Sequence, residues 1–166
     1  SGLGKAMAAL FGRLGATVAI CGRDADKLDE AKEFLEGAGI SCWSRAMTIR
    51  DPKAVGELIA DLTAELGRLD TLVNNAGGQF PQAAIDFSVN GWNAVIDTNL
   101  NGSWYMMQAA ARHWQEQSRT GNIINIVADI WRGLPQMAHT AAARAGVIYA
   151  SKTVAVEWAP LGIRVN

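Results

Sequence analysis

Short apolar runs alternate with longer amphipathic stretches along this chain of 166 residues. The segment Thr17–Cys21 is a short, continuous apolar run, as expected for a strand that is buried on both faces. The next stretch, Asp24–Leu35, has apolar residues at helical spacing and begins with a residue suited to an N-cap. Strands separated by helices of this length are joined by right-handed crossovers and lie parallel. The alternation therefore predicts an α/β fold of Rossmann type, with a doubly wound parallel sheet.

The other elements follow the same alternation. Asp51–Pro52 is a typical helix start, because proline at the first helical position lacks only an N–H that would be free there anyway. No repeat or second domain is evident, so residues 1–166 are predicted to form a single, partial domain. The remaining expected helices are Lys5–Leu14, Asp51–Leu66, Ser88–Gln117 and His139–Trp158, and the remaining expected strands are Ile40–Met47, Leu69–Val73, Asn122–Val127 and Ile163–Val165.

Composition argues against several classes of function. The formal net charge of −1 provides no basic surface for nucleic acid or for a membrane. No apolar run reaches the ~18 residues of a membrane span. Cys21 and Cys42 lie far apart, and neither CxxC nor HExxH occurs, so no metal site is expected. Two free thiols are typical of a cytoplasmic protein.

The chain begins with Ser1, Gly2, Leu3 and Gly4, which lead directly into a helical pattern. Two glycines at the start of a helix suit a pyrophosphate site, because a ligand can approach the backbone and the free N–H groups of the first turn. A GxG at the start of a chain also arises by chance, and the strand that should precede it is not in the sequence. We interpret the chain as part of a longer domain.

The end of the Thr17–Cys21 strand carries Arg23. A site for NAD needs an acidic residue there to hold the ribose 2′-hydroxyl, whereas an arginine can pair with the 2′-phosphate of NADP. The alternative is a solvated arginine at a strand end. A second strand is followed by Asn74, Asn75, Ala76 and Gly77, which can line an adenosine pocket or form a simple turn.

Taken together, these motifs resemble the short-chain dehydrogenase/reductase family, and the resemblance covers essentially the whole chain. It implies a family strand before residue 1, and a substrate-covering loop and last strand after residue 166. The residues that carry it are Gly2–Gly4, Asn74–Gly77, Asn99 within Asp97–Leu100, Gly121–Ile126 and Trp158–Asn166.

Two stretches, Leu72–Phe80 and His139–Val147, are similar to the branch of peroxisomal trans-2-enoyl-CoA reductases and 2,4-dienoyl-CoA reductases. This resemblance implies that NADPH reduces a double bond conjugated to an acyl-CoA thioester. It also implies a cytoplasmic location, or a peroxisomal one if the source is eukaryotic.

The family's catalytic set of Asn, Ser, Tyr and Lys is mostly replaced in this chain. Asn99 is in place, but Val127–Ala128 stands at the serine, Thr140 at the tyrosine and Arg144 at the lysine. In the family pattern the lysine lowers the pKa of a tyrosine one helical turn away. Here His139 is a candidate acid or donor beside the lost tyrosine, although a capping role is equally plausible.

These replacements favour enoyl reduction over alcohol oxidation. Hydride addition to an enoyl thioester builds charge on the thioester oxygen, which fixed donors can stabilise. Arg144 cannot act as a base, but it can hold the nicotinamide ribose. The alternatives are a catalytically silent dinucleotide-binding protein and a carbonyl reductase or alcohol dehydrogenase.

The two longest expected helices, Ser88–Gln117 and His139–Trp158, are apolar over much of their circumference. Such surface serves either a core or an interface. By family resemblance, the two helices would join subunits into a homodimer or homotetramer, with the tryptophans Trp92, Trp104, Trp114 and Trp158 contributing to the packing.

Overall fold

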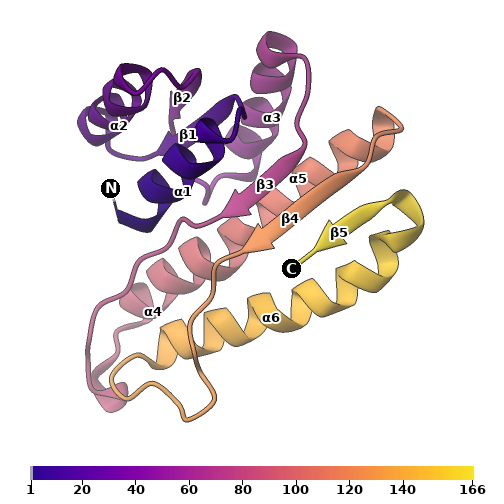
Figure 1. The fold of residues 1–166 in the computed structure, drawn as a ribbon. Helices are drawn as coiled ribbons and strands as arrows, with labels where there is room; N and C mark the ends of the chain where they lie inside the picture. Colours follow the sequence, from indigo (N-terminus) through magenta and orange to yellow (C-terminus); the bar gives the residue numbers. More distant parts are fainter. Residues whose placement is uncertain (1) are drawn as a thin grey trace.

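The computed structural model describes residues 2–166 and shows helices packed on parallel strands (Figure 1). The predicted cofactor contact at Ser1 lies outside the described residues. The helices are α1 (Gly2–Arg13), α2 (Ala25–Gly37), α3 (Pro52–Leu66), α4 (Val89–Ile96), α5 (Gly102–Glu116) and α6 (Ala138–Trp158), and the strands are β1 (Val18–Gly22), β2 (Cys42–Ala46), β3 (Thr71–Asn74), β4 (Gly121–Asn125) and β5 (Ile163–Val165).

The predicted helix starts at Asp24 and Asp51 are confirmed. Each carboxylate accepts a hydrogen bond from a backbone N–H of the first turn, that of Lys27 for α2 and that of Lys53 for α3. The start of α1 is different: the helix begins at Gly2 and not at Lys5. The glycine segment therefore forms the first turn of α1.

The single helix predicted over Ser88–Gln117 is interrupted by one π-helical segment, η2 (Asp97–Asn101), which separates α4 from α5. The carbonyl of Ala94 accepts hydrogen bonds from Thr98 Oγ1 (2.9 Å) and Arg50 Nη2 (2.8 Å). These side-chain donors support the irregular turn, and within it Thr98 and Asn99 are buried. Such insertions often occur at functional sites.

The predicted α/β fold with parallel strands is confirmed, and the strands of this chain are grouped into two parallel sheets. β1 pairs with β2, and β3, β4 and β5 pair in that order. β1 and β3 are not hydrogen-bonded to each other.

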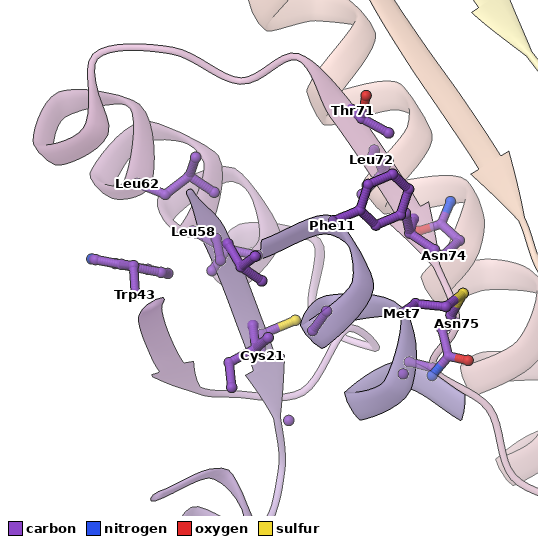
Figure 2. Close-up of a pocket in the computed structure, with 18 of the residues that line it drawn as sticks. Met7, Phe11, Cys21, Trp43, Leu58, Leu62, Thr71, Leu72, Asn74 and Asn75 are labelled. Carbon is purple, nitrogen blue, oxygen red and sulfur yellow. The ribbon is translucent and has the colours of Figure 1, made fainter. Parts of the chain in front are cut away.

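A cavity of about 790 Å³ separates the edges of β1 and β3. Figure 2 shows Met7 and Phe11 of α1, Leu58 of α3 and Leu72 of β3 among the residues that line it. Most of the lining is apolar, as in a protein core. The lining also includes Gly4, Arg23, Asn75 and Ala76, so the cavity reaches the predicted cofactor residues.

Two hydrophobic clusters hold the elements together. The larger joins α3 and α5 to the β3–β4–β5 sheet around Trp114, whose Nε1 donates to the Leu69 carbonyl (2.7 Å). The smaller joins α1 and α2 to β1 and β2 around Leu35. Within residues 2–166, no helix is both long and apolar enough to span a membrane.

Candidate functional site

The carboxyl ends of β3 and β4 point in the same direction in Figure 1, and the N-terminal part of α6 lies beside the junction of α4 and α5. In open α/β sheets, ligands bind at this edge. The candidate site is therefore formed by the start of α1, the segment after β3, η2 and the first turns of α6.

The first turn of α1 has the geometry of an anion site. Gly2 has φ +60°, a conformation that favours glycine. Gly4 lies against the next segment of the site, because a Cβ on it would come 2.7 Å from Asn75 Nδ2. The backbone N–H groups of the first turn, including that of Leu3, have no partner within a helix, and the helix dipole favours negative charge there. A pyrophosphate fits this arrangement.

Asn99 connects η2 to the segment after β3. Its Oδ1 accepts from Gly78 N (2.9 Å) and its Nδ2 donates to Gly78 O (2.9 Å). The side chain thus pairs with a peptide unit as a neighbouring strand would. Asn99 is only 1% exposed. The two bonds hold Gly78 against η2.

Arg144 lies opposite this segment, on α6. Burial lowers the pKa of its guanidinium, which forms no ion pair with any residue in the described range 2–166. Its Nη2 occupies the space beside Gly77 where a side chain would otherwise stand. A half-buried cation without an acidic partner is suited to a ligand that offers oxygen acceptors.

His139 and Thr140 lie at the start of α6, and both are almost completely buried. His139 Nδ1 accepts from Thr140 N (2.7 Å), so in the neutral ring the proton is on Nε2. Nε2 has no hydrogen-bond partner among residues 2–166. The ring packs against Phe80 (centroids 4.7 Å apart) and Phe87 (4.5 Å). Its predicted function as an acid stays a prediction.

Both tyrosines of the chain lie away from these residues. Tyr149 is 68% exposed, and Lys152 Nζ lies 4.8 Å from its ring centroid. Tyr105 packs against the larger hydrophobic cluster on α5. Tyr149 is five residues after Arg144, about 140° round the helix, so the spacing predicts that it faces elsewhere, and its exposure agrees with this. No phenol within residues 2–166 replaces the one missing at Thr140.

Arg23 and Asp24 lie between β1 and α2, and Asp26 and Lys27 lie at the start of α2. Arg23 is exposed and forms no ion pair within the described part of the chain. Asp24, the nearest acid, accepts from Lys27 N (3.2 Å) and Lys27 Nζ (2.7 Å). These bonds lower the pKa of Asp24. The carboxylate is thus already engaged, whereas the guanidinium is free to meet an anion.

The sequence reasoning missed two groups of residues that support the site. Asn125 links β3 to α6, because its Oδ1 accepts from Asn74 Nδ2 (2.8 Å) and its Nδ2 donates to Ser151 Oγ (2.9 Å). The position of Asn125 at the end of β4 was a usable signal. The packing of Phe80 and Phe87 on His139 had no such signal, since nothing in the local sequence connects them.

Comparison with known proteins agrees with the family resemblance of the sequence motifs. The chain matches the family described as short chain dehydrogenase over residues 1–166. It is 41% identical, over all of its own length and 66% of the relative's, to a probable 2,4-dienoyl-CoA reductase of Bacillus subtilis. The chain spans 54–66% of the length of the curated relatives it matches.

Solved structures also share the fold. A short chain dehydrogenase from Bacillus anthracis superposes with a TM-score of 0.96 at 45% identity, covering 100% of this chain and 68% of that one. A citronellol catabolism dehydrogenase of Pseudomonas aeruginosa superposes with a TM-score of 0.95 at 37% identity, with the same coverage.

Proposed function

The chain belongs to the short-chain dehydrogenase family of oxidoreductases, and we propose that it reduces the conjugated C=C bond of an enoyl-CoA or dienoyl-CoA thioester with NADPH. The observation that carries this proposal is that the tyrosine and lysine expected beside Asn99 are replaced. Thr140 and Arg144 stand where the family resemblance expects tyrosine and lysine, and both tyrosines of the chain lie elsewhere. The name of the Bacillus subtilis relative supports the same substrate class.

A carbonyl reductase needs an acid that protonates the new alkoxide, and a tyrosine phenol does this in the family pattern. An enoyl reductase has a different requirement. When hydride is added at the β-carbon, the electron pair of the C=C bond moves toward the thioester, and charge builds on its oxygen. Hydrogen-bond donors stabilise that oxygen, and water supplies the proton to the α-carbon.

The chain's own residues fit a dinucleotide at this edge. Gly2, Leu3 and Gly4 would hold the pyrophosphate at the start of α1, and Asn75, Ala76 and Gly77 would border the adenosine and nicotinamide riboses. Bound NADPH supplies the hydride. We propose that Arg23 pairs with the 2′-phosphate, because the guanidinium is exposed and the neighbouring Asp24 is engaged by Lys27.

We propose Arg144 as the residue that holds the nicotinamide ribose. Its guanidinium remains charged and carries several donors, but it cannot serve as a base. The Thr140 hydroxyl, 3.3 Å from His139 Nδ1, is the proposed donor to the thioester oxygen. His139 is buried and bonded to Thr140, so we assign it an effect on catalysis through the position of Thr140.

The proposal is tested by following NADPH oxidation with crotonyl-CoA, a 2,4-dienoyl-CoA and a simple ketone as substrates. We expect turnover with one or both thioesters and none with the ketone. The reverse result would refute the proposal in favour of a carbonyl reductase.

A catalytically silent protein is the second candidate, and the missing tyrosine and lysine favour it. A separate measurement of NADPH binding distinguishes it. Tight binding without turnover of any of the three substrates would assign the chain to this class.

The proposed homodimer or homotetramer rests on α4, α5 and α6. Among their residues, Tyr149 and Val156 on α6 are exposed, at 68% and 77%. In contrast, Trp114 is fully buried, and Trp104 stacks on Trp158 with ring centroids 6.4 Å apart. Trp114 therefore packs within the subunit, whereas the half-buried Trp104 and Trp158 keep exposed surface that a partner subunit would cover. Sedimentation of the wild-type protein and of Val156→Glu tests whether this face of α6 joins subunits.

A further inference from the structure

Gly77 is a glycine at a position where the backbone conformation does not require one. Its φ lies outside the positive range that favours glycine. The residue is exposed, so burial does not demand a small side chain either. What excludes a side chain is the surrounding space: a Cβ would come closer than 3.0 Å to Arg144 Nη2 and 3.1 Å from Asn99 Oδ1.

The two neighbours of that Cβ differ in their freedom to move. Asn99 Oδ1 is fixed by its bond from Gly78 N (2.9 Å), and the Asn99 side chain is buried. The guanidinium of Arg144 is the end of a flexible side chain and makes no ion pair within residues 2–166. A methyl group at residue 77 would therefore mainly displace the guanidinium.

A lysine at residue 144 would not meet this obstacle. Counted along the side chain, lysine Nζ falls at the position of arginine Cζ. Arg144 Cζ lies 3.6 Å from the Cβ built on Gly77, an ordinary van der Waals distance. Arginine at residue 144 thus needs the space that glycine leaves at residue 77, whereas lysine does not.

We propose that Gly77 is a positioning residue for Arg144. Its missing side chain leaves the space for the outer nitrogen of the guanidinium, and the Asn99–Gly78 bonds hold that space in place. The Gly77–Arg144 pair sets where the cation meets the cofactor. This inference rests on the proposed function in taking NADPH as the ligand.

The test compares the wild-type protein, Gly77→Ala, Arg144→Lys, the double variant and Gly78→Ala. The Gly78 variant is the matched control, because a Cβ there meets no atom within 4 Å and its backbone bonds to Asn99 are retained. Two readouts are used. One is the Kd of NADPH, and the other is the rate at which phenylglyoxal labels Arg144 in the cofactor-free protein, located by mass spectrometry.

For Gly77→Ala we expect the Kd of NADPH to rise about tenfold, as when one hydrogen bond to a charged group is lost. Labelling of Arg144 should become faster, because the displaced guanidinium is less buried. The melting temperature should stay near that of the wild type. The double variant should bind NADPH no more weakly than Arg144→Lys alone, and Gly78→Ala should change the Kd far less.

Three results would overturn the inference. The first is unchanged labelling of Arg144 in Gly77→Ala. The second is a double variant in which the two losses of NADPH affinity add, since a clash of the new methyl group with Asn99 or with the cofactor would then be the cause. The third is a rise in the Kd of NADPH in Gly78→Ala as large as that in Gly77→Ala. A wild-type protein that does not bind NADPH would refute the proposed function, and the labelling rates would still decide the inference.

Discussion

Arg23 and Arg144 are two arginines without ion pairs within residues 2–166, and their surroundings are opposite. Arg23 is exposed after β1, where water surrounds the guanidinium and few contacts restrict it. Arg144 is half-buried on α6, and burial lowers the pKa of its guanidinium. The interactions of an exposed charge are strongly screened by salt, and water readily takes the place of its partner. The interactions of a buried charge depend instead on the residues packed around it.

The largest effect is expected where the cation is buried. Arg144→Ala should lower kcat/KM for the enoyl thioester about 100-fold, because the half-buried guanidinium that orients the nicotinamide ribose is lost. Steady-state kinetics with NADPH measures this. Arg119→Ala is the control, since Arg119 is exposed between α5 and β4, away from the site. Equal losses in both variants would contradict the assignment.

A smaller loss is expected from Asn99→Ala, which removes both bonds to Gly78. Activity should fall by about tenfold and unfolding free energy by about 1 kcal/mol, because the partly exposed peptide can bind water instead. Asn99→Asp keeps the acceptor for Gly78 N but places a buried carboxylate oxygen against Gly78 O, so its losses should be at least as large as those of Asn99→Ala. Denaturant unfolding and kinetics on the same samples separate the two effects.

At the exposed arginine, we expect a change of preference rather than a loss of catalysis. Arg23→Ala should raise KM for NADPH about tenfold and leave KM for NADH unchanged, because only NADPH carries the 2′-phosphate. Added salt should weaken NADPH binding to the wild type more than to the variant. Equal effects on both cofactors would place the 2′-phosphate elsewhere.

The smallest effect concerns Asp24, which lies beside Arg23 and bonds Lys27. Asp24→Asn keeps an N-cap and frees the Lys27 ammonium, so NADPH affinity should rise about twofold. The folded pKa of Asp24 is lowered, so its stabilising contribution is present above the unfolded pKa of about 3.9 and is lost as pH falls through the folded value. Melting temperatures below pH 4 should therefore decline more in the wild type than in Asp24→Asn.

The same contrast separates what was predictable from what was not. Arg23 could be proposed from the sequence because its signal is local. It follows a strand and stands at the position where, in a site for NAD, an acidic residue would hold the ribose 2′-hydroxyl. The positions of Asn99, Thr140 and Arg144 came from motif spacing. Their surroundings did not, since Asn99 bonds a residue 21 positions away and His139 packs on rings from another loop.

The sequence by itself determined the order of helices and strands, the caps at Asp24 and Asp51, and the residues that carry the family motifs. These depend on periodicity and on contacts within one helical turn. Only the tertiary structure decided the π-helical segment around Asn99, the division into two sheets, and the packing of Arg144 beside Gly77. Those features arise from contacts between distant segments, whose fit depends on three-dimensional shape and not on local preference.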